Sequence, residues 1–412
     1  MSYKTDKWFT SPWNFAQEVR SQLNFAPKIE LHDVTLRDGE QQAAVTFRKD
    51  DKVRIAELLA EAGIHRIEAG MPAVSKEDEA AIKEIVKRKL GPKIFAFGRC
   101  MKDDVMRAVD CGVDGIVMEV PSSDHIVKHA YKWPLEKAVE LSIEATQYAK
   151  KHGLYTVFFP IDASRADINW FLDLIQRIEK DGHMDALAVV DTFGGCSPHA
   201  IPYLIKKVRE RIKKPLETHF HDDFGMGAAN TVLGLAAGAN VAHTTVSALG
   251  ERAGNAAYED VVMTLLTMYG IDLGIKTEKL YPISKEVREL AKVQIRGNRG
   301  IVGDDIFKIE SGIISGWLRN CGEEQALELC PYRWDLVGHA APEVVLGKNN
   351  GADSIKIWLE RIGRPVPDDA TITEILQKVK DRALAKRGLL TLRDFEDILA
   401  KLGQTKISAA KA

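Results

Sequence analysis

The sequence predicts an α/β protein: a TIM (β/α)8 barrel with a helical C-terminal subdomain region. Eight short β-rich runs alternate with longer helical patterns from about residue 30 onward, which is typical of this barrel. Several of the runs are apolar on both faces, as strands of a parallel sheet covered by helices must be. The competing fold is a doubly wound open sheet, but the first turn, TLRDGEQQ, lacks the glycine-rich loop that such a sheet usually carries there.

The individual elements follow from local patterns. The expected strands cover residues 30–36, 65–70, 93–98, 115–120, 155–161, 186–192, 216–221 and 241–248. Amphipathic helix patterns lie between the strands, for example over 51–63 and 136–153. The second of these ends in Lys-Lys-His-Gly, which is typical of a helix C-terminus.

The pattern changes beyond residue 270. Residues 276–328 read as mostly helical, with glycine-rich interruptions at 296–305 and 310–316, and residues 370–403 read as a helical hairpin. We therefore expect three parts in the chain. They are an N-terminal extension over 1–27, a catalytic barrel over 28–275 and helical C-terminal subdomains over 276–412.

Composition and charge argue against several classes of protein. Lys plus Arg is 57 and Asp plus Glu is 59, so no basic field exists to attract nucleic acid or an anionic membrane surface. No uncharged apolar run reaches the about 18 residues that suggest a membrane-spanning helix. The N-terminus lacks a signal-peptide pattern, and the five cysteines form no CxxC pair. These features predict a cytoplasmic protein.

The candidate site lies where the strands end, because reactive side chains of this barrel stand at the carboxyl ends of its strands. His219 and His221 share one face of the seventh strand, since alternate residues point to the same side. An isolated His-x-His motif also occurs by chance. The case for a metal site is stronger with Asp38 after the first strand and Asn255 after the eighth. Strands one, seven and eight are neighbours in a closed barrel, so all four side chains could meet. The four side chains suit Mn²⁺, Mg²⁺ or Zn²⁺ with open positions for a substrate.

Arg37 precedes Asp38 and would place a guanidinium beside the cation, where it could stabilise an enolate or a developing oxyanion. The alternative is a salt bridge between Arg37 and Glu68 of the second strand. Both can hold, because an ion pair would orient the arginine. Glu251, in the loop after the eighth strand, is either part of the site or half of an ordinary surface ion pair with Arg252.

Taken together, these motifs resemble those of the DRE-TIM metallolyases, which include the isopropylmalate, homocitrate and citramalate synthases and hydroxymethylglutaryl-CoA lyase. The resemblance covers about residues 30–365 and rests on segments 33–41, 68–72, 121–125, 162–165, 191–194, 219–230 and 250–255. The GERAGN loop (250–255) is similar to that of the Claisen-condensing synthases and lacks the cysteine of the lyase. The region after the barrel also resembles the helical subdomains of the synthases.

The resemblance implies roles for particular residues. The metal ligands would be Asp38, His219, His221 and Asn255, and the catalytic residues Arg37, Glu68 and Glu251. The oxo-acid pocket would include Arg37, Gln41, Ser122, Arg165 and Thr192. The resemblance further implies a 2-oxo acid substrate, acyl-CoA as a possible co-substrate, and a homodimer in which the C-terminal subdomains serve as lid and dimerisation region.

The chain departs from the synthase pattern in ways that bear on the acyl-CoA half of the site. Ile309 and Ile314 stand where the synthases usually have histidines, and Ile161 stands where they often have a glutamate. One of those histidines belongs to the base system for acetyl-CoA in the family, and isoleucine cannot take a proton. Another residue, such as Tyr332 or His339, would then have to serve as the base.

Three functions are compatible with these residues. The first is a Claisen-type condensation of an acyl-CoA with a 2-oxo acid, giving a 2-hydroxy (alkylmalate-like) diacid. The second is a metal-dependent lyase or aldolase that acts on a 2-hydroxy or 2-oxo acid without acyl-CoA, which the missing histidines favour. The third is a relative that binds a metabolite without turnover, which the intact set of metal ligands disfavours. We favour the first.

Overall fold

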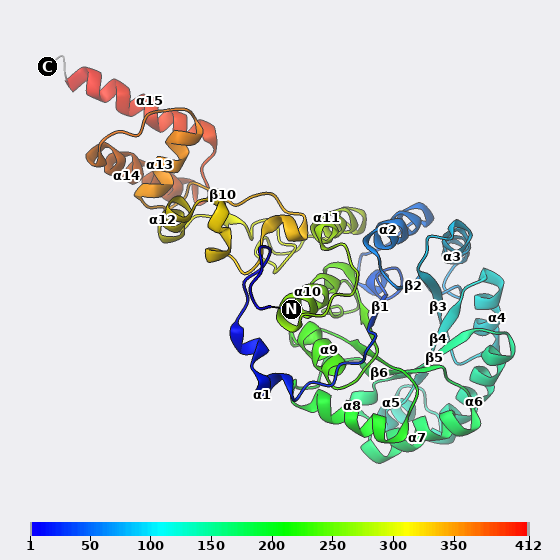
Figure 1. Ribbon diagram of the computed structural model, residues 1–412. Helices are drawn as coiled ribbons and strands as arrows, with labels where there is room; N and C mark the ends of the chain where they lie inside the picture. Colours follow the sequence, from blue (N-terminus) through cyan, green and yellow to red (C-terminus); the bar gives the residue numbers. More distant parts are fainter. Residues whose placement is uncertain (1, 410–412) are drawn as a thin grey trace. The chain divides into compact units, whose positions relative to one another are not determined.

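The computed structural model describes residues 2–409 (Figure 1). The chain divides into two compact units, which are described separately. The larger unit contains Ser11–Arg296 and residues 300–302, and the smaller unit contains Lys4–Thr10, Gly297–Arg299 and the chain from Gly303 onward. The domain boundaries at residues 27 and 275 stay sequence-based predictions.

The larger unit is a closed barrel of eight parallel strands surrounded by helices, so the predicted TIM barrel is confirmed (Figure 1). Its strands are β1 (Glu30–Asp33), β2 (Arg66–Glu68), β3 (Lys93–Arg99), β4 (Gly115–Pro121), β5 (Tyr155–Ile161), β6 (Ala186–Asp191), β7 (Leu216–Phe220) and β8 (Val241–Thr244). The barrel closes where β1 pairs with β8, with His32 opposite His243.

Most helices of the larger unit alternate with the strands and bury apolar residues, whereas α1 precedes β1 and buries none. The helices are α1 (Gln17–Arg20), α2 (Lys49–Ala62), α3 (Lys76–Arg88), α4 (Lys102–Cys111), α5 (Asp124–His129), α6 (Leu135–Lys151), α7 (Ile168–Asp181), α8 (Ala200–Arg211), α9 (Gly227–Ala236), α10 (Tyr258–Thr264) and α11 (Leu280–Ala291). Local chemistry sets their ends: the Ser75 side chain accepts a hydrogen bond from the Asp78 backbone at the start of α3, and α2 ends at Gly63 with φ 94°.

Strand β8 is shorter than the sequence predicts. It ends at Thr244, and residues 246–248 form a 3₁₀ turn in which Ser247 and Ala248 both have φ 58°. The Thr245 hydroxyl donates to the Leu249 carbonyl at 2.6 Å and stabilises this turn. The turn directs the chain into the GERAGN loop, which lies at the carboxyl end of the barrel.

The interior of the barrel has an apolar half and a polar half. Strands β3 to β6 supply a cluster made of Phe95, Phe97, Val117, Val157, Phe159, Ala186, Ala188 and Val190. Strands β1, β2, β7 and β8 instead supply the buried side chains of His32, Glu68, Glu217, His219 and His243. Buried ionisable groups are costly unless they are paired, and branched apolar residues usually fill such a barrel. Packing alone therefore does not explain the buried side chains of the polar half.

Asp33 on β1 provides a test of this packing. Burial raises the pKa of its carboxyl to about 7, although Thr35 donates to it. Between pH 4 and 7 the folded state then binds more protons than the unfolded state, so stability falls as pH rises. Relative to Asp33→Asn, the free energy of unfolding of the wild type should fall by up to about 1.4 kcal/mol per pH unit across this range. Urea unfolding at several pH values measures the difference, and a difference independent of pH would contradict the expectation.

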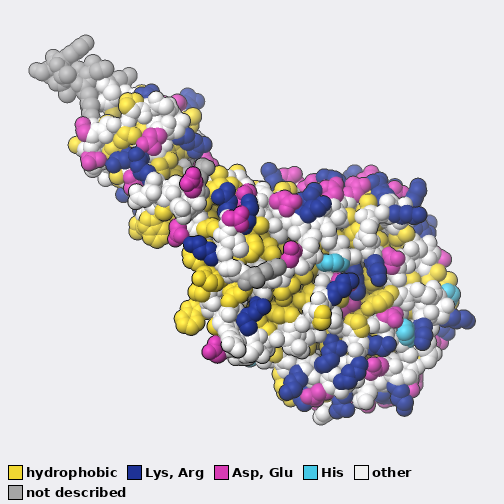
Figure 2. Space-filling model, viewed as in Figure 1, with side chains coloured by type: hydrophobic (Ala, Val, Ile, Leu, Met, Phe, Trp, Pro, Cys, Tyr) yellow, Lys and Arg dark blue, Asp and Glu magenta, His cyan; other side chains and the backbone are white. Residues whose placement is uncertain are grey.

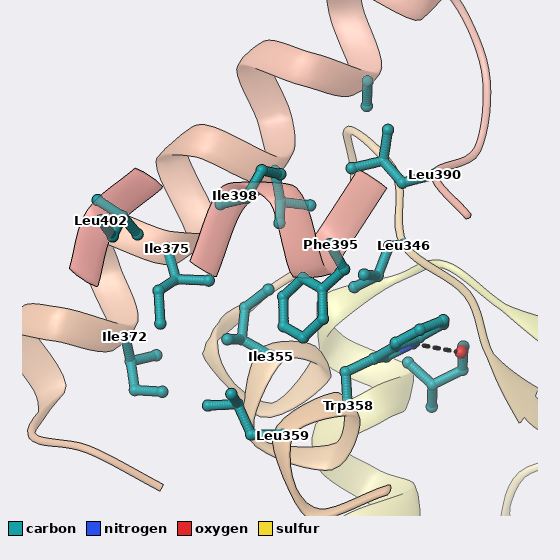
Figure 3. Packing of buried hydrophobic residues seen from close by; sticks show 13 residues of the cluster. Leu346, Ile355, Trp358, Leu359, Ile372, Ile375, Leu390, Phe395, Ile398 and Leu402 are labelled. Carbon is teal, nitrogen blue, oxygen red and sulfur yellow. Dashed lines mark hydrogen bonds between the residues drawn. The ribbon is translucent and has the colours of Figure 1, made fainter. Parts of the chain in front are cut away.

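The smaller unit has its own core. It contains β9 (Lys308–Ile309), α12 (Gly312–Cys321), β10 (Glu343–Val344), α13 (Ala352–Arg361), α14 (Asp369–Lys386) and α15 (Leu392–Ala409). Figure 3 shows the ring of Phe395 within the buried cluster, and its centroid lies 5.7 Å from that of Trp358. The Trp358 indole donates to the Val344 carbonyl at 2.7 Å, so the buried N–H has a partner. The hairpin expected over 370–403 corresponds to α14 and α15.

Two details of the smaller unit differ from the sequence reading. The glycines of 310–316 do not interrupt a helix: α12 begins at Gly312 and contains Gly316. A Cβ at Gly312 would lie 2.6 Å from the Gly351 backbone nitrogen, so this glycine permits close packing of two backbones. In addition, the N-terminal residues Lys4–Thr10 belong to this unit, where Phe9 N donates to the Pro331 carbonyl at 2.8 Å.

Within residues 2–409, no helix combines the length and the apolar character needed to cross a lipid bilayer. On the face drawn in Figure 2, basic and acidic side chains are interspersed over the larger unit. This mixed surface agrees with the nearly balanced charge of the sequence.

Candidate metal centre

The carboxyl ends of β1 and β7 bring three of the four predicted metal ligands together. The Oδ2 atom of Asp38 lies 3.3 Å from His219 Nε2 and 3.7 Å from His221 Nε2. One possible ligand atom from each residue lies within 4.8 Å of the others, and all three residues are buried. The two-residue period of a strand explains why both imidazoles face the same side: His219 is in β7, and His221 follows it by two residues.

Asn255 joins this group through the loop after β8. Its backbone forms a β-bridge with His221, and its Nδ2 donates to the Leu249 carbonyl at 3.4 Å. A Cβ at Gly250, where φ is 149°, would collide with Asn255 Nδ2 and lie 3.1 Å from Asp38 Oδ1. The Asn255 amide thus lies beside Asp38, and its buried Oδ1 has no hydrogen-bond partner among the described residues.

The protonation states of these side chains suit a cation. Burial by itself would raise the pKa of Asp38, but the Arg37 charge and the two histidines hold it well below its usual value. Burial lowers the pKa of His219 to about 3, despite the nearby Asp38 carboxylate, and burial also lowers the pKa of His221. A carboxylate and neutral imidazoles are the forms that bind metal ions.

Arg37 is held rigidly next to this group. Its Nε donates to Glu68 and its Nη1 donates to Asp38 at 2.9 Å and to the Gln41 amide oxygen at 3.3 Å. The guanidinium also lies over the Phe97 ring, 3.9 Å from the centroid. The remaining nitrogen, Nη2, is buried and has no partner in the part of the chain that is described. The salt bridge between Arg37 and Glu68, which the sequence left as an alternative, is therefore present. It leaves the Nη2 nitrogen of Arg37 without a partner among the described residues.

Three other predicted pocket residues gather around Asp162, in the loops after β4, β5 and β6. Arg165 binds the Asp162 carboxylate through two hydrogen bonds of 2.7 and 3.0 Å, and the Thr192 hydroxyl accepts one from Asp162 N at 2.8 Å. The Ser122 hydroxyl donates to the Ile161 carbonyl at 2.7 Å. These side chains order the loops, and their contact with a substrate stays a prediction.

Glu251 is placed differently from the other candidate catalytic residues. Its side chain is 58% exposed and lies 3.6 Å from Arg252, as the surface ion-pair reading expected. Its backbone N–H, however, donates to Asp38 Oδ1 at 3.3 Å. The loop therefore orients Asp38 through its backbone, and a catalytic role of the Glu251 carboxylate stays untested.

The fold agrees with comparisons to known proteins. A family model described as HMGL-like matches residues 28–287. The chain belongs to the HMGL-like family. The resemblance to the DRE-TIM metallolyases, inferred from the motifs, is thereby confirmed.

Curated relatives of this HMGL-like chain are named as synthases. The chain is 36% identical over 374 residues to a homocitrate synthase of Methanothermobacter thermautotrophicus, covering 91% of this chain and 93% of that protein. It is 40% identical over 356 residues to a putative (R)-citramalate synthase of Archaeoglobus fulgidus, covering 86% and 71%. Among solved structures, the HMG-CoA lyase of Bacillus subtilis matches with a TM-score of 0.59 at 22% identity, covering 66% of this chain and 97% of that one, which concerns the fold alone.

The site of this HMGL-like barrel includes buried residues that the sequence reading missed. His219 Nδ1 lies 3.3 Å from His243 Nδ1, and His243 Nε2 lies 2.7 Å from a carboxylate oxygen of Glu217. A signal for Glu217 was present: it precedes His219 by two residues on the same strand and so shares its face. A charged residue on the interior face of a barrel strand is rarely there for packing alone.

Proposed function

We propose that the protein catalyses a divalent-metal-dependent, Claisen-type condensation of an acyl-CoA with a 2-oxo acid, giving a 2-hydroxy diacid. One observation carries the proposal: the buried Arg37 Nη2, which has no partner among the described side chains and backbone, lies beside the cluster of Asp38, His219 and His221. Relatives named as homocitrate, isopropylmalate and citramalate synthases support the reaction type.

The residues present fit a divalent cation. The unpartnered Asn255 Oδ1, the ionised Asp38 and the neutral imidazoles of His219 and His221 form a mixed oxygen and nitrogen donor set. These four residues would hold the ion. When bound, a divalent cation supplies Lewis-acid polarisation of the ketone and carboxylate of a 2-oxo acid. Mn²⁺, Mg²⁺ and Zn²⁺ all remain candidates.

Arg37 would act on the substrate directly. Its Nη2 donates to the ketone oxygen, on which negative charge develops as the new carbon–carbon bond forms. Glu68 and Gln41 fix the guanidinium plane, so little reorganisation is needed during the reaction. Glu68 is thus a positioning residue in this proposal, and Ser122, Arg165 and Thr192 would shape the pocket for the oxo acid.

The acyl-CoA half of the reaction requires a base. The α-carbon of the thioester loses a proton and attacks the ketone carbon, and water then cleaves the thioester and releases free CoA. Ile309 and Ile314 cannot take this proton, so Tyr332 or His339 is proposed instead. Both rings pack against Phe307 in the smaller unit, at centroid distances of 6.1 and 5.2 Å.

Assembly and location complete the proposal. We infer a homodimer from the resemblance to the synthases, with the C-terminal subdomains as the dimerisation region. We infer a cytoplasmic location from the five cysteines, all of which are free, as a reducing compartment would keep them.

A substrate panel tests the function. Metal-loaded protein is incubated with 2-oxo acids, with and without acetyl-CoA, and free thiol is measured. We expect CoA release only when metal, oxo acid and acetyl-CoA are all present, because the ketone must be polarised before the carbon nucleophile attacks. Pyruvate or acetate release without acyl-CoA would favour the lyase or aldolase instead. The isoleucines at positions 309 and 314, which replace the histidines of the synthases, favour that alternative. Absence of any metal-dependent oxo-acid binding would exclude both functions.

A further inference from the structure

Beneath the candidate metal centre, a chain of buried polar groups runs through the barrel interior. His219 Nδ1 faces His243 Nδ1 at 3.3 Å, and His243 Nε2 faces Glu217 Oε2 at 2.7 Å. The other oxygen of Glu217 accepts from Arg66 Nη1 at 2.8 Å. His219, His243 and Glu217 are at most 1% exposed. We call this series the interior relay.

We propose that His243 and Glu217 are positioning residues that fix the tautomer of His219, so that its Nε2 lone pair is presented to the metal, and that they do not form a metal site of their own. This inference rests on the proposed function only in taking His219 as a ligand. It assigns a role to two residues that neither touch the proposed substrate nor bind the ion.

The argument follows from counting protons. A neutral imidazole carries one N–H, so an Nε2 lone pair on His219 requires the proton on Nδ1. In the described residues, the hydrogen-bond partner of that N–H is His243 Nδ1, which must then be the acceptor. The N–H of His243 is therefore at Nε2 and donates to Oε2 of Glu217, while the other carboxylate oxygen of Glu217 accepts from Arg66. Each N–H in the relay has one acceptor.

The same logic excludes a competing interpretation. His32, Glu217 and His243 offer ligand atoms within 4.8 Å of one another and could form a second cation site. A cation there would need the His243 Nε2 lone pair, which places the His243 proton on Nδ1, facing His219. His219 would then have to carry its proton on Nε2, toward Asp38, and the first site would be lost. The Arg66 guanidinium on Glu217 also opposes a second cation.

The relay should therefore contribute to metal affinity. Partners of ligating histidines typically change metal affinity by about 10- to 100-fold when they are removed. His243→Phe keeps an aromatic ring in the barrel but removes the acceptor for His219. His243→Gln supplies a carbonyl oxygen that can accept the same hydrogen bond. His65 provides a matched control, because its ring accepts a backbone hydrogen bond from Leu31 at 3.1 Å and lies outside the relay.

Two measurements test the proposal. Calorimetric titration of the metal-free full chain with Mn²⁺ should give one ion per chain, a Kd that rises about 10- to 100-fold in His243→Phe, a substantial recovery in His243→Gln and little change in His65→Phe. Nitrogen-15 NMR of histidine-labelled wild type should show His219 protonated at Nδ1, and His243→Phe should shift it toward the Nε2–H form. A merely structural role for His243 would not move this tautomer.

The outcomes separate the inference from the function. Unchanged Mn²⁺ affinity in a folded His243→Phe variant would overturn the relay while leaving the metal centre in place. A second Mn²⁺ that disappears in His32→Phe would also overturn it. If His243→Phe does not fold, the tautomer of His219 in the wild type decides, and an Nε2–H form in the metal-free protein would overturn the relay. Absence of Mn²⁺ binding in the wild type would remove the proposed metal centre and the relay together.

Discussion

Asp38→Asn should abolish metal-dependent turnover and weaken Mn²⁺ binding by at least about 100-fold, the upper range for loss of a residue that only supports a ligand. Asp38 is the one carboxylate in the proposed ligand set, and it lies within 3.7 Å of both imidazole Nε2 atoms. An amide retains the shape but not the charge that offsets the cation. Asn255 already supplies an amide oxygen, so the variant would leave the ion without an anionic ligand.

The variant should also change the packing around Arg37, which loses one of its two carboxylate partners. Removal of one partner of a buried ion pair can cost about 3 kcal/mol or more, although Glu68 remains bound to Arg37. Thermal unfolding must therefore accompany the Mn²⁺ titration and the assay for CoA release. Asp114→Asn is the matched control, because Asp114 accepts a backbone hydrogen bond from Ile94 at the opposite end of the barrel. Full Mn²⁺ affinity in folded Asp38→Asn would refute the ligand assignment.

The grouping of Asp38, His219 and His221 was predictable because it depends on two simple rules. Strand periodicity places His219 and His221 on one side, and barrel closure makes the ends of β1, β7 and β8 neighbours. Neither rule requires knowledge of side-chain packing. The Arg37 and Glu68 pair was foreseen only as an alternative, because spacing does not show whether a buried guanidinium keeps a free donor.

The interior relay was not predicted, for a physical reason. His243 is the only imidazole in its strand and pairs in register with His32 across the barrel closure, which joins residues far apart in the sequence. A single imidazole in a strand gives no sign of its partner. Glu217, by contrast, could have been recognised, since it shares a strand face with His219.

Glycine was the least informative residue type for the C-terminal region. The glycines of 310–316 read as helix breaks, yet Gly312 begins α12 and makes room for Gly351. Whether a glycine ends a helix or lets two backbones approach depends on a neighbour about forty residues away, as Gly312 and Gly351 are. The ends of β8 illustrate the same limit, because Ser247 and Ala248 adopt positive φ without any glycine in the turn.

Arg37→Lys should lower kcat by about 100- to 1,000-fold, the range found when one donor to a developing oxyanion is removed. Lysine keeps the positive charge, but a single nitrogen cannot serve Glu68, Asp38 and a substrate oxygen in the fork geometry of a guanidinium. It also loses the stacking on Phe97. Because Arg37 is not a proposed ligand, Mn²⁺ affinity should stay within a few-fold of the wild type.

Steady-state kinetics and Mn²⁺ titration of the same preparations separate two roles for this arginine. Arg209→Lys is the control, since Arg209 donates to the Lys214 and Gly238 carbonyls of the larger unit and not to any proposed site residue. A loss confined to kcat means that Nη2 acts on the reacting oxygen. A parallel loss of Mn²⁺ affinity would mean instead that Arg37 acts by holding Asp38, through the 2.9 Å hydrogen bond from Nη1. An unchanged kcat would contradict the role proposed for Nη2, because the positive charge of lysine would then suffice without the guanidinium donor.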